Sequence, residues 1–228
     1  IMNLVIVESP AKAKTINKYL GSDYTVLASY GHIRDLPSKN GSVDPENDFK
    51  MIWEIDSFSK KYLKEITDSA KNSSKIILAT DPDREGEAIA WHVREFLEEK
   101  KLLKDKKVER VVFNEITKKA VTSGIDNPRQ IESQLVDAYM ARRALDYLVG
   151  FNISPILWTK LPGSKSAGRV QSVALRLLTE REHEIEIFKP DEFWTLNVIF
   201  EDKNKSKITA NVNQLNGKKT EKFTFKSK

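Results

Sequence analysis

Short apolar runs alternate with helical patterns through the first half of the chain. Residues 3–7, 24–29, 75–80 and 108–113 each combine aliphatic or β-branched residues with Gly, Pro, Ser or Asn boundaries, which is typical of buried strands. Amphipathic patterns follow these runs, as in the stripe of Ile89, Val93, Phe96 and Leu97. The alternation predicts an α/β fold with a mainly parallel, Rossmann-like sheet and helices on both faces.

The strand pattern ceases near residues 125–128, Ile-Asp-Asn-Pro, where we expect a domain boundary. The second half predicts a long helix over 130–151, a Pro-bounded connector over 153–162 and a second helix over 164–187. The core stripe of that second helix is expected to be Val170, Ala174, Leu177 and Leu178.

Two alternating runs, 193–200 and 208–212, predict antiparallel strands, and Asn216-Gly217 is a strong hairpin-turn signal. Phe223 and Phe225 are expected on a third strand. We therefore expect three parts, residues 1–125, 126–190 and 191–228, the last being the start of an antiparallel β domain that continues in further chain.

The amino-acid composition excludes several kinds of functional site. The 228 residues include no cysteine, which excludes disulfides, thiolate metal sites and a cysteine nucleophile. The net charge of +5 leans mildly toward polyanionic partners. No apolar run reaches membrane-spanning length and no signal segment is recognisable, so a cytoplasmic protein without a membrane partner is the default expectation.

Four carboxylates follow the strand at 75–80 at once: Asp81, Asp83, Glu85 and Glu87. Ligands bind outside the carboxyl ends of strands in open α/β sheets, and carboxylate oxygens suit Mg²⁺. The alternative is that Asp81 or Asp83 simply caps the following helix. Four like charges within seven residues repel one another without a cation, which favours a metal site.

The first strand also ends in an acid, Glu8. If the strands at 3–7 and 75–80 are parallel neighbours, Glu8 and Asp81 lie at the same rim of the sheet. Lys12 falls in the first turn of the helix that Ser9-Pro10 begin, where the helix dipole disfavours a cation. A lysine there is explained if it faces a phosphate, and otherwise it points into solvent.

Residues 164–169 combine small hydroxyls, a glycine and two cations in the expected first turn of the second long helix. Such a turn can bind a phosphate, although a capped helix with a solvated basic face is the commoner meaning of the pattern.

Five segments together resemble the bacterial DNA topoisomerase I family, the type IA topoisomerases. They occur in the family's order and are residues 7–16 (Val-Glu-Ser-Pro-Ala-Lys-Ala-Lys-Thr-Ile), 31–37 (Gly-His-Ile-Arg-Asp-Leu-Pro), 81–92 (Asp-Pro-Asp-Arg-Glu-Gly-Glu-Ala-Ile-Ala-Trp-His), 113–117 (Phe-Asn-Glu-Ile-Thr) and 166–173 (Ser-Ala-Gly-Arg-Val-Gln-Ser-Val). The first and third resemble its toprim domain. The Asp-x-Asp element alone is shared with primases and some nucleases, which leaves a toprim primase or nuclease as the alternative.

The resemblance implies an ATP-independent isomerase that relaxes negatively supercoiled DNA through a 5′-phosphotyrosine link and needs Mg²⁺. By position it assigns Glu8, Asp81, Asp83 and Glu85 to the metal, and Glu8, Lys12 and Arg84 to catalysis. Glu8 would serve as general acid–base and Lys12 would stabilise charge on the scissile phosphate.

The resemblance also implies contacts with single-stranded DNA, a monomeric state and a cytoplasmic, nucleoid-associated location. The DNA-contacting positions are His32, Arg110, Arg142, Arg143, Asp146, Phe151, Trp158, Ser166, Ala167, Gly168, Arg169, Val170 and Gln171. Arginines beside an aromatic residue fit phosphate binding combined with base stacking.

One departure concerns the nucleophile, which in the family lies in a Tyr-x-Arg-Thr-Asp-Ser-like motif. None of the six tyrosines in this sequence has that context. We therefore expect an N-terminal piece that supplies the magnesium and DNA contacts, lacks the nucleophile and does not relax DNA by itself. In isolation it would behave as a binding module without chemistry.

Overall fold

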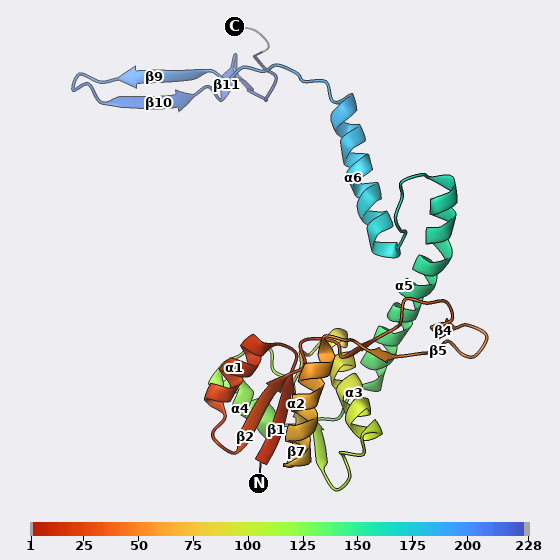
Figure 1. The fold of residues 1–228 in the computed structure, drawn as a ribbon. Coiled ribbons are helices and arrows are strands. Elements are labelled where there is room, and N and C mark those ends of the chain that lie inside the picture. Colours follow the sequence, from red (N-terminus) through yellow and green to blue (C-terminus); the bar gives the residue numbers. More distant parts are fainter. Residues whose placement is uncertain (1, 226–228) are drawn as a thin grey trace. The chain divides into compact units, whose positions relative to one another are not determined.

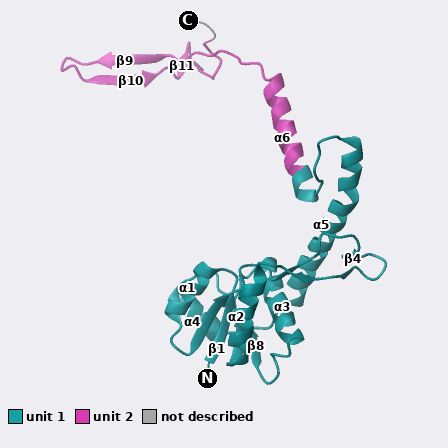
Figure 2. Ribbon diagram, in the orientation of Figure 1, with its two compact units in different colours: residues 1–172 teal, residues 173–228 magenta. Residues whose placement is uncertain are grey.

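The computed structural model describes residues 2–225. The chain divides into two compact units, residues 1–172 and 173–228, shown in different colours in Figure 2. The first unit contains an α/β sheet and a long helix, and the second contains short antiparallel strand pairs.

Four parallel strands form the main sheet of the first unit. In the order β2-β1-β7-β8, they are Tyr24–Ala28, Met2–Val7, Ser73–Leu78 and Lys107–Arg110. The parallel pairing confirms the α/β expectation, and it places β1 and β7 side by side at the centre of the sheet.

Helices cover both faces of this sheet (Figure 1). On one face lie α1 (Pro10–Tyr19) and α4 (Lys118–Asp126), and on the other lie α2 (Ser59–Lys71) and α3 (Arg84–Glu99). Sequential strands joined through helices return in the same direction, so the four strands present their carboxyl ends at one edge.

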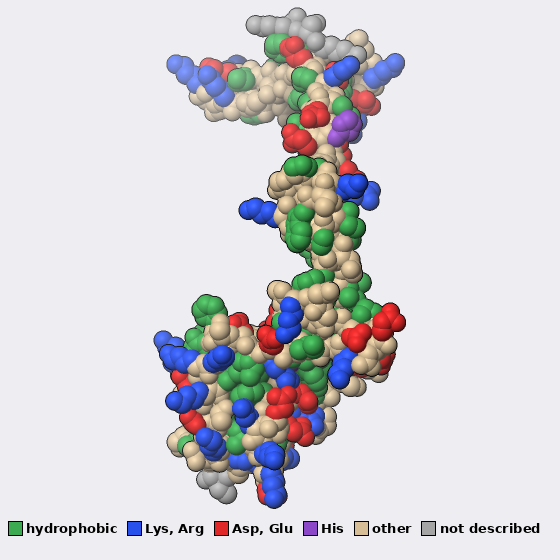
Figure 3. All heavy atoms as spheres, turned by 45° about the vertical axis from the view of Figure 1, so that its right-hand side comes forward, with side chains coloured by type: hydrophobic (Ala, Val, Ile, Leu, Met, Phe, Trp, Pro, Cys, Tyr) green, Lys and Arg blue, Asp and Glu red, His purple; other side chains and the backbone are tan. Residues whose placement is uncertain are grey.

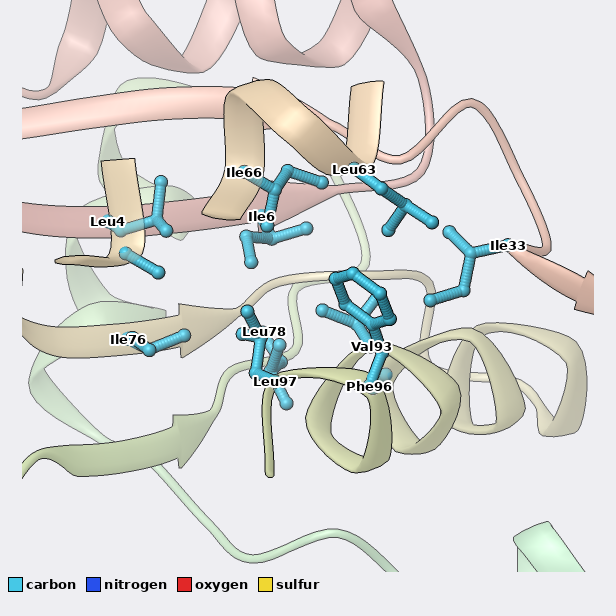
Figure 4. Packing of buried hydrophobic residues seen from close by; sticks show 12 residues of the cluster. Leu4, Ile6, Ile33, Leu63, Ile66, Ile76, Leu78, Val93, Phe96 and Leu97 are labelled. Carbon is cyan, nitrogen blue, oxygen red and sulfur yellow. The ribbon is translucent and has the colours of Figure 1, made fainter. Parts of the chain in front are cut away.

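Strand residues alternate between the two cores. Leu4 and Ile6 of β1 pack toward α2 and α3, as Figure 4 shows, whereas Val5 and Val7 pack with α1 and α4. β7 repeats the pattern, with Ile76 and Leu78 on the α2–α3 side. All of these side chains are essentially buried, so the sheet is held from both sides and its carboxyl edge is a rigid base for a site.

Two short hairpin-like pairs connect β2 to α2. β3 (Arg34–Asp35) pairs with β6 (Glu54–Ile55), and β4 (Val43–Asp44) pairs with β5 (Lys50–Met51). Leu36 and Val43 of this segment pack against Ala144 and Tyr147. The connection thereby fixes the long helix α5 (Ser133–Lys160) against the α/β core.

The prediction of a connector at residues 153–162 was wrong. α5 continues through Pro155 as far as Lys160, because a proline removes one backbone hydrogen bond without ending a helix whose neighbouring turns are intact.

The helix expected from residue 164 begins later. α6 spans Arg169–Ile187, and residues 164–168 are non-helical. Gly163 has φ +89° and Gly168 follows five residues later, so the segment is punctuated by the residues least suited to a helix interior. The expected core stripe was also wrong: among the described residues no side chain of α6 is buried, and Val170 and Leu178 are about 70% exposed.

The second unit confirms antiparallel pairing. β9 (Asn197–Glu201) pairs with β10 (Lys207–Asn211), and β11 (Gln214–Leu215) pairs with β12 (Lys218–Lys219). The predicted Asn216-Gly217 turn joins the last pair, with both residues at positive φ (50° and 78°), as a type I′ turn requires. The expected third strand is reduced to one bridge between Trp194 and Phe225.

Within residues 2–225, none of the helices has both the length and the apolar character that crossing a membrane requires.

Candidate active site

Two acids from different parts of the sequence meet at the carboxyl edge of the sheet. Glu8 directly follows β1, and Asp81 follows β7, the neighbouring parallel strand. The Lys12 ammonium donates to the Glu8 carboxylate and to Asp81 Oδ1, the latter at 2.5 Å. The expected convergence of Glu8 and Asp81 is therefore confirmed, with Lys12 between them.

Local sequence fixes Lys12 in this position. Ser9 caps α1 by accepting from the Lys12 backbone N–H at 3.4 Å, and Pro10 occupies the first helical position. Partial burial works against the ammonium form, but the hydrogen bonds to Asp81 and Glu8 raise the pKa of Lys12 above its ordinary value. Lys12 is therefore a fixed positive charge at neutral pH.

Asp83 has a different role from Asp81. Its carboxylate is the N-cap of α3 and accepts from the Gly86 N–H at 2.8 Å, so the capping alternative is correct for this residue. A Cβ on Gly86 would fall on the backbone of Asp81, 2.7 Å from its nitrogen, which leaves room only for glycine. The acidic loop and the first turn of α3 are thus packed backbone to backbone.

Glu85 contacts helix α5. Its Oε1 accepts from Arg142 Nη1 at 2.7 Å, and its Oε2 lies 3.2 Å from His32 Nε2. The four predicted metal ligands therefore divide into a pair at Lys12, a helix cap and a partner of Arg142.

Among residues 2–225, no three His, Asp or Glu side chains form a group that could hold a metal by themselves. The oxygen donors nevertheless fit Mg²⁺, which usually binds one or two carboxylates together with water and substrate phosphates. One buried oxygen of Glu8, Oε2, has no hydrogen-bond partner in the described structure. A cation beside Glu8 and Asp81 would satisfy it.

A cavity of about 220 Å³ lies between Glu85 of α3, the loop after β2 and α5. Its lining residues are His32, Asp35, Glu85, Tyr139, Arg142, Arg143 and Asp146. The His32 ring stacks on Tyr139 with centroids 5.0 Å apart. Burial, with the nearby Asp35 and Glu85 charges, raises the pKa of Tyr139 to about 12, so its hydroxyl stays protonated at neutral pH.

The arginines of this cavity are held by carboxylates. Arg143 makes two hydrogen bonds to Asp35, at 2.7 and 2.8 Å, and Arg169 Nε lies 2.7 Å from Asp146 Oδ1. Burial opposes ionisation of Asp35, but the Arg143 hydrogen bond outweighs it and lowers the pKa of that carboxyl. The cavity therefore presents oriented guanidinium groups whose remaining N–H donors can take phosphate oxygens.

Arg110 was assigned to DNA contact, and that assignment was wrong. The side chain is 1% exposed. It donates to Glu87 Oε2 at 3.0 Å and to the carbonyls of Leu78, Thr80 and Asp81 at 2.6–3.1 Å. Because its guanidinium donates to groups inside the protein, Arg110 positions the acidic loop and does not bind a ligand. Arg84, by contrast, is exposed in the first turn of α3.

Sequence reasoning missed Glu87 as a structural acid. It is fully buried and accepts from Arg110, from Arg129 at 2.8 Å and from the Glu132 N–H at 2.7 Å. Burial raises the cost of its charge, but these donors dominate and lower the pKa of Glu87. The signal was its helical phase: Glu87 lies one turn before the buried Ala90 on α3, two residues after the partly exposed Glu85.

The remaining predicted DNA residues lie along the outer part of α5 and after it. Phe151 stacks on Tyr147 with centroids 4.4 Å apart, and Trp158 donates to the Lys165 carbonyl at 2.6 Å. In the 166–171 segment, the Ala167 N–H is already taken by Ser154 Oγ at 3.1 Å, and Ser166 pairs with Gln171. This segment offers its exposed side chains rather than a free helical first turn.

Basic and acidic side chains are interspersed on the face of the first unit seen in Figure 3. No single large field of one sign dominates that face, so recognition of a polyanion depends on local groups such as the cavity arginines.

Comparison with known proteins identifies both parts of the chain. Residues 3–116 match the Toprim domain family, and residues 130–228 match the DNA topoisomerase family. The chain is 61% identical to DNA topoisomerase 1 of Zymomonas mobilis over 227 residues, which covers all of this chain and 19% of that protein. It is 58% identical to the Rickettsia bellii DNA topoisomerase 1 over 225 residues, 98% of this chain and 28% of that protein.

The structure agrees with these matches. Full-length topoisomerase I from Thermotoga maritima superposes with a TM-score of 0.72 at 40% sequence identity, covering 96% of this chain and 36% of that one. The chain thus spans less than a third of the curated relatives cited above. It belongs to the type IA DNA topoisomerase family and carries that family's N-terminal Toprim domain.

Proposed function

We propose that this chain works as the N-terminal part of an ATP-independent type IA topoisomerase that relaxes negatively supercoiled DNA through a transient 5′-phosphotyrosine. The observation that carries the proposal is the Lys12 ammonium held between Glu8 and Asp81 at the carboxyl edge of the sheet. Acting on chromosomal DNA, the protein would be monomeric, cytoplasmic and associated with the nucleoid.

In this proposal the three groups act on one phosphate. Lys12 stabilises the negative charge that builds up on the phosphate oxygens when the tyrosine oxygen attacks. Glu8 lies beside it and gives a proton to the departing 3′-oxygen, then takes it back during resealing. None of the six tyrosines in this sequence has the family's motif context, so none of them is proposed as the nucleophile.

Toprim domains generally bind Mg²⁺. Here Glu8 and Asp81 would hold it together with water, and the ion would supply positive charge to phosphate oxygens of the bound strand. Arg110 and Glu87 keep the loop that bears Asp81 in place, whatever the occupancy of the site.

Single-stranded DNA would enter beside α5. Arg142 and Arg143 line the cavity, and Arg169 pairs with Asp146, another lining residue. Each arginine can exchange its carboxylate partner for a phosphate, since both present paired oxygens to a guanidinium fork. Phe151 and Trp158, 36% and 57% exposed, offer ring faces to bases further along α5.

A chimera tests the proposal. This chain would replace the matching 225 residues of the Rickettsia bellii topoisomerase, and relaxation of negatively supercoiled plasmid would be followed on gels. We expect Mg²⁺-dependent relaxation without ATP, and a loss of about 10²–10³-fold for Lys12→Ala, as for removal of one transition-state donor. Lys14→Ala, two residues along the same helix and exposed, is the matched control.

This 228-residue chain by itself is expected not to relax the plasmid. Relaxation by the chain alone, or an active Lys12→Ala chimera, contradicts the proposal. Metal-dependent nicking without a covalent protein–DNA adduct would support a Toprim nuclease instead.

A further inference from the structure

An exposed aromatic pair stands beside the Glu8 site and has no part in the chemistry above. The rings of Tyr30 and Tyr62 are stacked, with centroids 3.6 Å apart and planes 17° from parallel. Tyr30 remains 49% exposed although it stacks on a neighbour. A large ring with one face covered and the rest open is a ready surface for another flat group.

The backbone ties Tyr30 to the site. Ser29 N–H donates to the Val7 carbonyl at 2.8 Å, and Gly31 N–H donates to the Glu8 carbonyl at 2.9 Å. Tyr30 lies between these two anchors with φ +62°, a left-handed conformation that is uncommon for an aromatic residue. Such strain persists where the surroundings enforce it, and it clusters at ligand-binding positions.

Two exposed lysines are close to Tyr62 in the sequence. Tyr62 lies in the first turn of α2, directly after Lys60 and Lys61. Both lysines are exposed, and within residues 2–225 neither forms an ion pair. Phe58, just before the helix, is 83% exposed. Aromatic faces interleaved with free cations are the composition of surfaces that bind single-stranded nucleic acid.

We propose that Tyr30 and Tyr62, with Lys60 and Lys61, form a stacking platform for an unpaired base of the single-stranded DNA next to the Glu8–Lys12–Asp81 site. The platform rests on the proposed function, because it takes the same strand. Tyr62 belongs to α2 and the cavity arginines belong to α5, so the strand would be held by two separate elements in addition to Lys12.

The test uses the full 228-residue chain and a fluorescein-labelled 12-mer oligothymidine, with the dissociation constant measured by anisotropy over a salt series. Tyr30→Asn removes the ring and tolerates left-handed backbone. We expect about tenfold weaker binding, the usual worth of one stacked base, with the salt slope unchanged. Tyr30→Phe should bind as the unaltered chain does.

The matched control is Phe49→Asn, since Phe49 is 51% exposed and also left-handed (φ +53°) but lies in the β4–β5 turn. Replacing single thymidines by abasic sites gives a second measurement. At one position of the oligonucleotide, the abasic site should weaken binding by the unaltered chain but should not weaken binding by Tyr30→Asn. Circular dichroism checks that each variant is folded, and Tyr62→Ala provides an independent way to remove the platform.

The outcomes separate the two proposals. If the unaltered chain binds and Arg142→Ala weakens it while Tyr30→Asn and Tyr62→Ala do not, the platform is refuted and the proposed function stands. If the unaltered chain does not bind the oligonucleotide at all, the proposed function fails and the platform fails with it.

Discussion

Helix α3 carries two glutamates, two residues apart, that are both held by arginines and yet do opposite work. Glu87 is fully buried with Arg110 and Arg129, whereas the Glu85 side chain is 41% exposed beside Arg142. A buried ion pair cannot release its partner without leaving an unpaired charge in low dielectric, but an exposed pair can. The same pairing chemistry therefore builds the scaffold on one side of α3 and, on the other, leaves the exposed pair that we propose exchanges its carboxylate for a phosphate.

The largest effect should come from breaking the buried side. Arg110→Leu leaves Glu87 and four backbone carbonyls short of donors, and we expect a loss of about 3–5 kcal/mol in the free energy of unfolding. Arg142→Leu, the matched change on the exposed side, should cost less than about 1 kcal/mol. Urea unfolding followed by circular dichroism measures both, and equal losses would contradict the comparison.

The pH dependence of the free energy of unfolding tests a second buried residue of α3, His92. Burial, with the Arg34 charge, lowers the pKa of His92 to about 3 from 6.5, so the unfolded chain takes up a proton between these values that the folded chain does not. Stability is fully present above pH 6.5 and falls as the pH drops toward 3, by up to about 1.4 kcal/mol per unit.

The His92 effect is best read between pH 6.5 and 5, above the range in which carboxylates titrate. Urea midpoints measured there should fall for the unaltered chain. His92→Gln, which can still accept from Arg34 but does not titrate, should show a much flatter dependence. An unchanged slope would assign the loss to other groups.

The smallest expected effect lies on the exposed side. Arg142→Ala should weaken oligothymidine binding about fivefold and reduce the slope of log K against log salt by about 0.7, the value for one phosphate contact on a single strand. Lys104→Ala removes the same charge beyond the far end of α3 and is the control. A slope unchanged by Arg142→Ala would mean that this arginine stays with Glu85 when DNA binds.

The sequence allowed the meeting of Glu8 and Asp81 to be predicted because it follows from topology alone. Two apolar runs that end in acids, in an alternating strand and helix pattern, must bring those acids to one edge if the strands are parallel neighbours. Lys12 could be placed there as well, since Ser9 and Pro10 fix the first turn of its helix.

The burial of polar side chains could not be predicted from the strand and helix pattern. Arg110 ends β8 as a solvent-facing residue would, and only Glu87 and Arg129, which come from other parts of the chain, enclose it. The extent of α5 was missed for a related reason: Pro155 stops a helix or merely interrupts one according to the packing around it, which no local pattern records.

Gly86 sets a limit on how this site can vary. Any other amino acid brings a carbon atom to the spot where the Asp81 peptide already lies, so the obstacle is the same for alanine as for tryptophan. Laboratory evolution of this loop should therefore find substitutions at Pro82 while position 86 stays invariant, and a library randomised at position 86 would return a single survivor.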